Sequence, residues 1–272
     1  MGTFTSRMFK DELMNIIISK EEFNLEKSVQ LGQVFGWKHD DKTGIYYKAL
    51  FNKLVTARQN DDVLEVSDER LIEYFDLRTS YNSIFKSLSL DEYTQSMIEL
   101  GKGIHILKQD FFEATITFIL SSCNNMQRIN LMRNNLCRVY GHKVTDGVYS
   151  DYTFPTLEEF EEKGLERLST LGFGYRLPYV IDAIQAFTKY PVELFTKLDD
   201  RMLYRALTSM NGIGPKEASC IMLFGAYRLN TFPIDRHIQR VIDAHYGGYY
   251  DMERYAPYNG IIQQYLFNGQ TS

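Results

Sequence analysis

The sequence lacks a long apolar run, and it contains few cysteines. Its best apolar runs, Ile16–Ile18 and Ile116–Leu120, fall far short of the ~20 residues that a membrane span needs, so we expect no membrane partner. The three cysteines are too scattered for a disulfide framework and lack the C-x-x-C spacing of a zinc or iron–sulfur site. Such sparse cysteine is typical of a reducing compartment, so we expect an intracellular protein.

The N-terminal residues carry charges on both sides of a short apolar run, so no secretory signal is predicted. They match a myristoylation pattern only loosely, through Gly2 and Ser6. Targeting to a membrane surface is therefore not expected.

An excess of positive charge is also missing. With 30 basic and 35 acidic residues the net charge is −5, which by itself disfavours nucleic acid as a partner. The distribution along the chain favours the opposite interpretation. Residues 123–143 contain four basic residues and no acidic one, and residues 201–246 contain six basic and three acidic residues. The first group is Arg128, Arg133, Arg138 and Lys143. Both segments are candidate nucleic-acid surfaces on an acidic chain.

The 272 residues, 44% of them hydrophobic and 14% aromatic, suffice for one large or two ordinary folded domains. Runs rich in β-formers predict an antiparallel sheet; they are Val29–Trp37, Ile45–Leu50, Leu54–Ala57 and Val63–Val66. From Asp68 onward the apolar spacing becomes helical. The sequence predicts an α+β fold, with an N-terminal antiparallel sheet plus helices over residues 1–100. A helical domain is predicted over residues 101–272.

Signals for the start of a helix recur after residue 100. Asp110 followed by Glu113 predicts the cap of a buried central helix over Phe111–Ser122. Thr156 with Glu159 forms a predicted capping box. All six prolines stand at or after Pro155, so the second half should be divided into short helices.

The segment NGIGPK is typical of a helix–hairpin–helix. Asp199 or Asp200 can cap a helix that runs to about Met210. Gly212 and Gly214 permit a tight turn, and a proline suits the first position of the next helix, to about Ala226. Free N–H groups at such a helix start can hold a phosphate. The spacing of a Walker phosphate loop is absent.

Two residues near this hairpin suggest chemistry. Lys216 stands in the first turn of the second helix, where the helix dipole disfavours its charged form. Asp235 opens another helix nineteen residues later. An amine nucleophile beside a fixed carboxylate suits attack at C1′ of a sugar, since the carboxylate stabilises positive charge there. Taken singly, Lys216 is also compatible with a surface lysine and Asp235 with a plain helix cap.

The sequence resembles a known family, the helix–hairpin–helix DNA glycosylases, and within it the 8-oxoguanine DNA glycosylase/AP lyases. The resembling segments, in chain order, are GQVFGW, EYFDL, GIHILKQDFFE, FILSSCNNMQRI, LGFGYRLPYV, NGIGPKEASC, FPIDRHIQRVI and QQYLF. Related endonuclease III and adenine-mispair enzymes usually carry a four-cysteine loop after the hairpin, but no cysteine follows Cys220. The 3-methyladenine branch generally lacks the hairpin lysine.

The resemblance implies that Lys216 is a Schiff-base nucleophile and Asp235 the catalytic carboxylate. It implies phosphate contacts by His237 and by the hairpin glycines Gly212 and Gly214.

For the damaged base, the resemblance implies a pocket built from four residues. Gly32 would accept the N7–H of 8-oxoguanine through its carbonyl, which guanine cannot donate. Cys220 would form one wall and a dipole with the lysine one turn earlier. Phe267 would stack on the base, and Gln263 would read its Watson–Crick edge.

For the opposite strand, the resemblance implies a loop that enters the duplex. Its residues are Cys123, Asn124 and Arg128, with Arg128 reading the estranged cytosine. Tyr175 would act as a wedge, and Arg176 as a second cytosine reader. Eukaryotic members carry asparagine where this chain has Cys123, which weakens the predicted preference for cytosine, because cysteine is short and a poor donor.

The expected activity is excision of 8-oxoguanine, placed opposite cytosine in double-stranded DNA, followed by β-elimination at the abasic site. The alternatives are a sibling glycosylase for another damaged base and a non-catalytic DNA-binding module, which needs neither Lys216 nor Asp235. No cofactor and no catalytic metal are expected. The resemblance implies that carbonyls around Thr208, Met210 and Ile213 can hold a structural cation. We expect a monomer acting where the genome is, in a prokaryotic cytoplasm or a nucleus.

Overall fold

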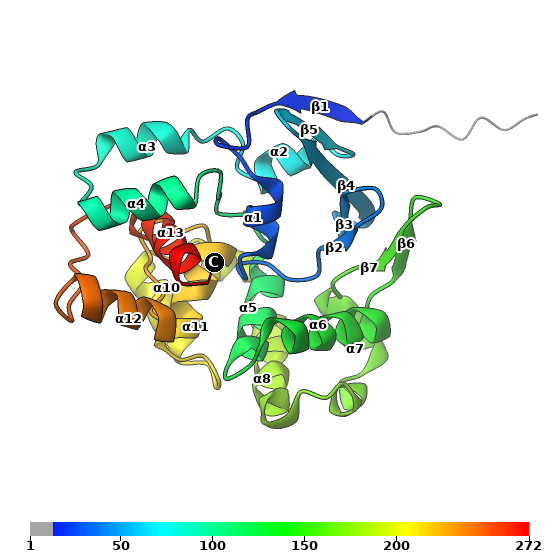
Figure 1. The fold of residues 1–272 in the computed structure, drawn as a ribbon. Helices are drawn as coiled ribbons and strands as arrows, with labels where there is room; N and C mark the ends of the chain where they lie inside the picture. The colour runs from blue at the N-terminus through cyan, green and yellow to red at the C-terminus, as the bar shows by residue number, and fades with distance from the viewer. Residues whose placement is uncertain (1–12, 272) are drawn as a thin grey trace, which may run out of the picture.

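The computed structural model describes residues 13–271. An antiparallel sheet forms one end of the molecule, and helices form the rest (Figure 1). The α+β class predicted from the sequence is confirmed. The N-terminal pattern that includes Gly2 and Ser6 lies outside the described residues.

The sheet has five antiparallel strands in the order β1-β5-β4-β3-β2. Their bounds are Met14–Ile17 for β1, Lys38–Asp40 for β2, Ile45–Leu50 for β3, Lys53–Asn60 for β4 and Val63–Val66 for β5. In β5 the buried residues Leu64 and Val66 alternate with half-exposed ones, as expected of a strand with one face on a core. That core also contains Leu25, Phe75 and Leu107. The three strands predicted from Ile45 to Val66 are confirmed.

The strand predicted over residues 29–37 is wrong. Asn24 caps a short helix α1, Leu25–Gln30, by accepting from the N–H of Lys27. An irregular segment follows, residues 31–37, in which Gly32 has φ +84° and Gly36 has φ +90°. The β-formers of this stretch are buried in the core, as Val34 is, instead of pairing in the sheet.

Three more helices complete the first hundred residues: α2 Arg70–Tyr74, α3 Tyr81–Ser87 and α4 Glu92–Leu100. Ser80 and Asp91 cap α3 and α4 through their side chains. The helical periodicity seen after Asp68 is thereby confirmed. The last of these helices packs against the C-terminal helix α13, Asn259–Thr271 (Figure 1).

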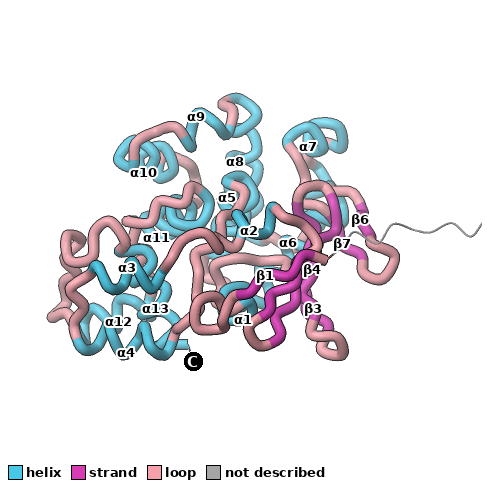
Figure 2. The backbone as a smooth tube through the Cα atoms, turned by 90° about the horizontal axis from the view of Figure 1, so that it is seen from above, coloured by secondary structure: helices cyan, strands magenta, loops and turns pink. Residues whose placement is uncertain are grey.

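Helix α5, Phe111–Ser121, is the central element of the helical body (Figure 2). Every residue from Phe111 to Leu120 is buried, and Asp110 caps the helix by accepting from the N–H of Glu113 at 2.8 Å. Around it lie α6 Met126–Tyr140, α7 Leu157–Lys163, α8 Leu177–Lys189, α9 Val192–Thr196, α10 Asp200–Thr208, α11 Pro215–Cys220 and α12 Arg236–His245. Short 3₁₀ turns span Glu166–Thr170 and Gly174–Arg176, and a π turn, Ile221–Gly225, extends α11. The predicted central helix is confirmed.

One part of the second half is not helical, contrary to the prediction. A hairpin pairs β6, Lys143–Thr145, with β7, Ser150–Tyr152. Asp146 closes its turn by accepting from the N–H groups of Val148 and Tyr149. After the hairpin, Thr156 and Glu159 form both hydrogen bonds of the predicted capping box at the start of α7.

Across residues 13–271, no helix is long and apolar enough to cross a membrane. All three cysteines are free thiols. In the same range, no cluster of three His, Cys, Asp or Glu side chains could hold a metal ion.

Candidate active site

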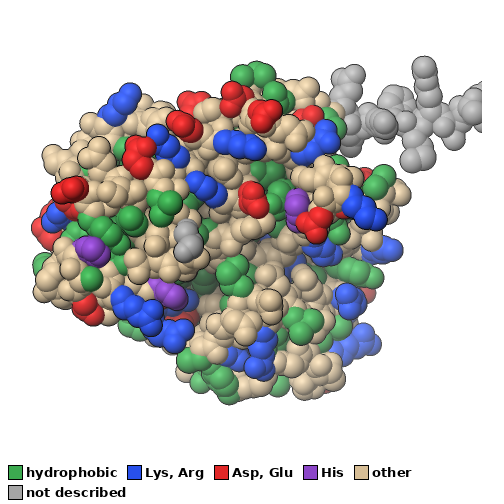
Figure 3. All heavy atoms as spheres, viewed as in Figure 1, with side chains coloured by type: hydrophobic (Ala, Val, Ile, Leu, Met, Phe, Trp, Pro, Cys, Tyr) green, Lys and Arg blue, Asp and Glu red, His purple; other side chains and the backbone are tan. Residues whose placement is uncertain are grey.

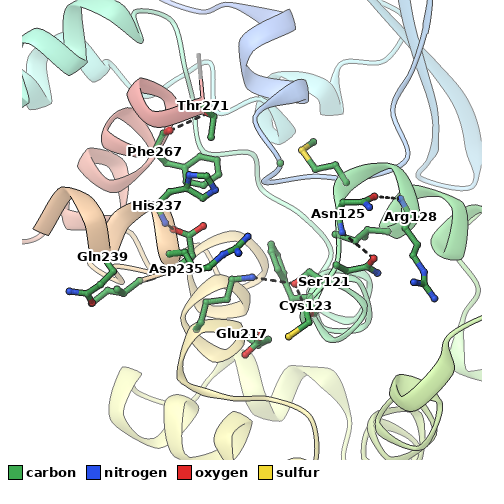
Figure 4. Close-up of a pocket in the computed structure, with 18 of the residues that line it drawn as sticks. Ser121, Cys123, Asn125, Arg128, Glu217, Asp235, His237, Gln239, Phe267 and Thr271 are labelled. Atoms are coloured by element: carbon green, nitrogen blue, oxygen red, sulfur yellow. Dashed lines mark hydrogen bonds between the residues drawn. The ribbon is translucent and has the colours of Figure 1, made fainter. Parts of the chain in front are cut away.

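A cavity of about 1370 Å³ lies where the α5–α6 loop faces α11, the start of α12 and the end of α13. Phe267, His237 and Asp235 lie on one side, and Ser121, Cys123 and Asn125 on the other (Figure 4). Of the predicted site residues, those that line the cavity are Gly32, Cys123, Asn124, Arg128, Lys216, Asp235, His237 and Phe267. The fold therefore gathers most of the predicted site residues around one cavity.

The hairpin next to this cavity forms as predicted. Asp199 caps α10 by accepting from the N–H of Met202 at 2.8 Å. Gly212 has φ +81°, and a Cβ there would collide with the Tyr179 ring, so this position requires glycine. Gly214 instead has φ −84° in extended backbone and serves as the N-cap of α11. Only Gly212 therefore uses the positive φ that glycine permits.

Lys216 extends from the first turn of α11 into the cavity, where it is half-buried. Its Nζ donates to the hydroxyl of Ser121 at 3.2 Å (Figure 4) and lies 5.7 Å from the centre of the Phe118 ring. Both partners belong to α5. The central helix thus holds the amine at the wall of the cavity.

Asp235 is the N-cap of α12, as predicted. Its Oδ1 accepts from the N–H groups of His237 and Ile238, both at 2.9 Å. These two backbone donors fix the orientation of the carboxylate at the start of α12. The side chain lines the same cavity as Lys216, so a carboxylate and an amine face one space.

His237 and Phe267 form an aromatic wall of the cavity. Their rings are 5.7 Å apart and cross at 77°, an edge-to-face contact. Phe267 is half-exposed on α13, a helix otherwise buried along most of its length. A large apolar ring that faces a cavity is available to stack on a planar ligand. Gly32, with φ +84° and a Cβ position only 3.4 Å from Met126 Sδ, borders the same space.

Two predicted pocket residues lie behind the cavity wall. Gln263 is buried, and its Nε2 donates to the Pro233 carbonyl at 3.1 Å while its Oε1 accepts from Gln264 at 2.8 Å. Cys220 is also buried, and burial raises the pKa of its thiol to about 11, against the opposing charge of Lys216. Burial therefore favours the neutral thiol of Cys220.

The loop between α5 and α6 presents Cys123 to solvent with φ +47°. Asn124 is turned inward, since its Nδ2 donates to the Leu120 carbonyl at 2.9 Å. Asn125 caps α6 by accepting from the N–H of Arg128, and the Arg128 side chain is exposed. The loop is therefore a hydrogen-bonded turn that places a thiol and a guanidinium at the cavity rim.

The side chains of Tyr175 and Arg176 donate hydrogen bonds to carbonyls of this loop. Tyr175 is 54% exposed, and its hydroxyl donates to the Ser122 carbonyl at 3.1 Å. Arg176 is only 3% exposed; its Nε donates to the Ser122 carbonyl at 2.9 Å and its Nη2 to the Cys123 carbonyl at 3.1 Å. The sequence predicts that Arg176 reads a cytosine, but its guanidinium is occupied as a brace for the loop. Reading a base would require it to release these carbonyls.

Positive charge lines both sides of the cavity. Lys and Arg side chains gather over α12 and over α6 on the face shown in Figure 3. Arg236 and Arg240 of α12 and Arg128 of α6 line the cavity. The prediction of a basic surface over residues 123–143 is wrong for Arg133, which is fully buried beside Glu113.

Several residues that line the cavity are not among those predicted from the sequence. Ser121, Arg236, Gln239 and Arg240 line the cavity, as Figure 4 shows for Ser121 and Gln239. The two arginines stand in the basic segment 201–246, so the helical spacing after Asp235 was an available signal. No sequence signal points to the serine. The carbonyls expected to hold a cation lie around the hairpin turn, where Met210 accepts from the Ile213 N–H at 3.3 Å.

A sheet domain followed by helices, with a helix–hairpin–helix beside a basic cavity, is the architecture of a DNA glycosylase. Residues 15–115 match the family "8-oxoguanine DNA glycosylase, N-terminal domain". Residues 116–252 match the "HhH-GPD superfamily base excision DNA repair protein". The chain therefore belongs to the HhH-GPD superfamily of base excision DNA repair proteins and carries the N-terminal domain of its 8-oxoguanine glycosylase branch.

Similar proteins agree with this assignment. An N-glycosylase/DNA lyase of Saccharomyces cerevisiae is 31% identical over 265 residues, which cover 85% of this chain and 70% of the yeast protein. A Clostridium acetobutylicum 8-oxoguanine glycosylase/lyase, solved with double-stranded DNA containing cytosine opposite 8-oxoguanine, is 26% identical with a TM-score of 0.84. That match covers 95% of this chain and 97% of the other. MBOgg1, solved with a low-affinity DNA ligand, is 27% identical with a TM-score of 0.87, covering 97% and 99%.

Proposed function

We propose that this protein is a bifunctional DNA glycosylase/AP lyase. It flips 8-oxoguanine out of duplex DNA, excises it and nicks the strand at the resulting abasic site. The observation that carries the proposal is the shared cavity of Lys216 and Asp235 beside the helix–hairpin–helix. The yeast relative is an N-glycosylase/DNA lyase by name, and the Clostridium acetobutylicum 8-oxoguanine glycosylase/lyase was solved with DNA that contains cytosine opposite 8-oxoguanine. Its place of action is inside the cell, with the genome.

In the first chemical step, Lys216 Nζ attacks C1′ and the bond from C1′ to the base breaks. The base leaves with the bonding electron pair, and the amine loses a proton. Positive charge develops on the sugar as the bond to the base lengthens, and the fixed carboxylate of Asp235 stabilises it. The contact with Ser121 directs the amine toward the sugar.

In the second step the sugar ring opens by cleavage of C1′–O4′, which leaves an imine between Lys216 and C1′. Loss of a C2′ proton then breaks the bond from C3′ to its phosphate oxygen, and the 3′ phosphate departs with the electron pair. Water hydrolyses the imine and regenerates the amine. Each step uses only the lysine, water and a proton acceptor, so the chemistry needs no cofactor.

Recognition uses the two sides of the cavity. Phe267 stacks on the flipped base, and the carbonyl of Gly32 accepts the N7–H that distinguishes 8-oxoguanine from guanine. Arg128 faces the strand that keeps the opposite base, for which cytosine is the proposed partner. Arg236, Arg240 and His237 contact the phosphate backbone around the flipped nucleotide.

The experiment is a comparison of duplexes that carry 8-oxoguanine, guanine, a 3-methyladenine analogue or an abasic site. We expect excision of 8-oxoguanine, no release of guanine, and strand nicking at both 8-oxoguanine and abasic sites. Release of only a different damaged base would show a sibling glycosylase. DNA binding without any release or nicking would contradict the enzymatic proposal altogether.

A further inference from the structure

The irregular segment 31–37, which carries Gly32 into the cavity, is held by side chains from other elements. Gln109 Nε2 donates to the Gln33 carbonyl at 2.7 Å, and Lys48 Nζ donates to the Phe35 carbonyl at 2.9 Å. Asn130 Oδ1 accepts from the N–H of Gly36 at 2.8 Å. The position of Gly32 therefore depends on side chains far from it in sequence.

Lys48 belongs to a buried ionic cluster with Glu113 and Arg133. Glu113 Oε1 lies 3.0 Å from Lys48 Nζ, 2.9 Å from Arg133 Nε and 2.8 Å from Arg133 Nη2. The three residues come from β3, α5 and α6 and are 1%, 7% and 0% exposed. Burial would raise the pKa of Glu113, but the charges of Arg133 and Lys48 outweigh burial and hold that pKa below its ordinary value.

The cluster contacts the segment at two consecutive residues. Lys48 holds the Phe35 carbonyl, and the Arg133 guanidinium fills the space beside Gly36, where any Cβ would collide with it. Asn130, one helical turn before Arg133 on α6, holds the N–H of Gly36. The same helix begins at the cavity with Met126 and Arg128. We call this group the clamp; its residues are Lys48, Glu113, Arg133 and Asn130. The clamp joins the segment that carries Gly32 to the helix that faces the opposite strand.

We propose that Lys48, Glu113, Arg133 and Asn130 are positioning residues for lesion recognition, which hold segment 31–37 so that the Gly32 carbonyl meets the flipped base. The proposal rests on the function proposed above. Buried ion pairs can often be replaced by apolar residues at no cost in stability, so stability alone does not account for three buried charges. A positioning role does, because each charge fixes the direction of a neighbour.

The abasic site offers a way to separate positioning from stability. Nicking of a preformed abasic site uses Lys216 and the DNA contacts but no base, so it does not depend on Gly32. Loosening the clamp should therefore slow excision of 8-oxoguanine and leave abasic nicking unchanged. A displacement on the order of an ångström can cost up to a hundredfold in rate. A merely structural role would lower both activities together.

The test uses Lys48→Met, which keeps the Glu113–Arg133 pair, and Asn130→Ala, which changes only a half-exposed side chain. Asn135→Ala, on the same helix, is the matched control, since Asn135 is similarly half-exposed. Thermal melting establishes which variants fold. Single-turnover rates are measured for 8-oxoguanine opposite cytosine and for an abasic site in the same duplex.

We expect excision to fall about tenfold or more in both variants, with abasic nicking within twofold of wild type, and no change for Asn135→Ala. If Lys48→Met fails to fold, Asn130→Ala decides the question alone. Unchanged excision, or equal loss of excision and nicking, would overturn the positioning role. Failure of the wild-type protein to excise 8-oxoguanine would instead overturn the proposed function.

Discussion

Lys216 Nζ donates to Ser121 Oγ at 3.2 Å, although the two residues are 95 positions apart in the sequence. The serine hydroxyl in turn donates to the Phe118 carbonyl at 2.7 Å, so its oxygen presents a lone pair to the amine. This contact ties the hairpin to the most deeply buried helix of the protein. It explains how a flexible lysine side chain is held toward one point of a large cavity.

Ser121→Ala should slow base excision about fivefold to tenfold, because the amine loses the acceptor that orients it. Single-turnover excision is the measurement, and Ser122→Ala is the control. Ser122 contributes only its main-chain carbonyl to the loop, which alanine keeps. Equal rates for Ser121→Ala and wild type would show that the hydroxyl has no part in orienting Lys216.

Asp235→Asn should slow excision by about 10²–10³-fold while the fold persists. The amide oxygen of asparagine can still accept from His237 and Ile238, so the helix cap survives, but the negative charge that faces the sugar is lost. Asp243→Asn, on the exposed side of α12, is the control. An excision rate for Asp235→Asn close to that of wild type would leave this residue with a capping role only.

Phe267→Ala should weaken binding to damaged duplex more than to undamaged duplex. Stacking of a base on an aromatic ring contributes about 1–3 kcal/mol, whereas the contacts to phosphate remain. The affinities for both duplexes are measured by titration, with Lys216→Gln added to each protein so that no base is excised. Equal losses on the two duplexes would contradict the assignment of Phe267 to the base pocket.

The opposite base should be read mainly by Arg128, because Arg176 is occupied by the carbonyls of Ser122 and Cys123. Arg128→Ala should flatten the preference among the four opposite bases, where a good two-point contact is worth about 1–3 kcal/mol. Cys123→Asn should sharpen the preference for cytosine, since an amide adds donors that a thiol lacks. Excision rates opposite all four bases decide this. An unchanged profile for Arg128→Ala would limit its charge to the phosphate backbone.

Local signals in the sequence predicted the elements that build the site. Side-chain caps at Asp110, Asp199 and Asp235 mark the starts of α5, α10 and α12, because a cap acts within one turn of the residue that provides it. The strands after Ile45 are rich in β-formers, which fit a pleated, half-buried surface. Such features depend on neighbours in sequence and can be recognised without the fold.

Features that depend on residues far apart in the sequence could not be predicted from local signals. Residues 29–37 contain β-formers because Val34 and Phe35 pack in a core, and the segment is irregular because Lys48 and Asn130 hold its backbone groups. Arg133 was counted as surface charge, since nothing in its own helix indicates a carboxylate partner on α5. The hairpin at 143–152 is different, because the Asp146-Gly147 turn is a local signal that predicts it.

The central claim is that Lys216 forms a covalent bond with the sugar. The most direct measurement is reduction with borohydride during reaction with duplex DNA that contains 8-oxoguanine opposite cytosine. Wild-type protein should become trapped on the DNA, with the crosslink located at Lys216 by mass spectrometry of the digested complex. Lys216→Gln should bind the same duplex but give no trapped complex and no excision. Trapping or full excision by Lys216→Gln would contradict the account.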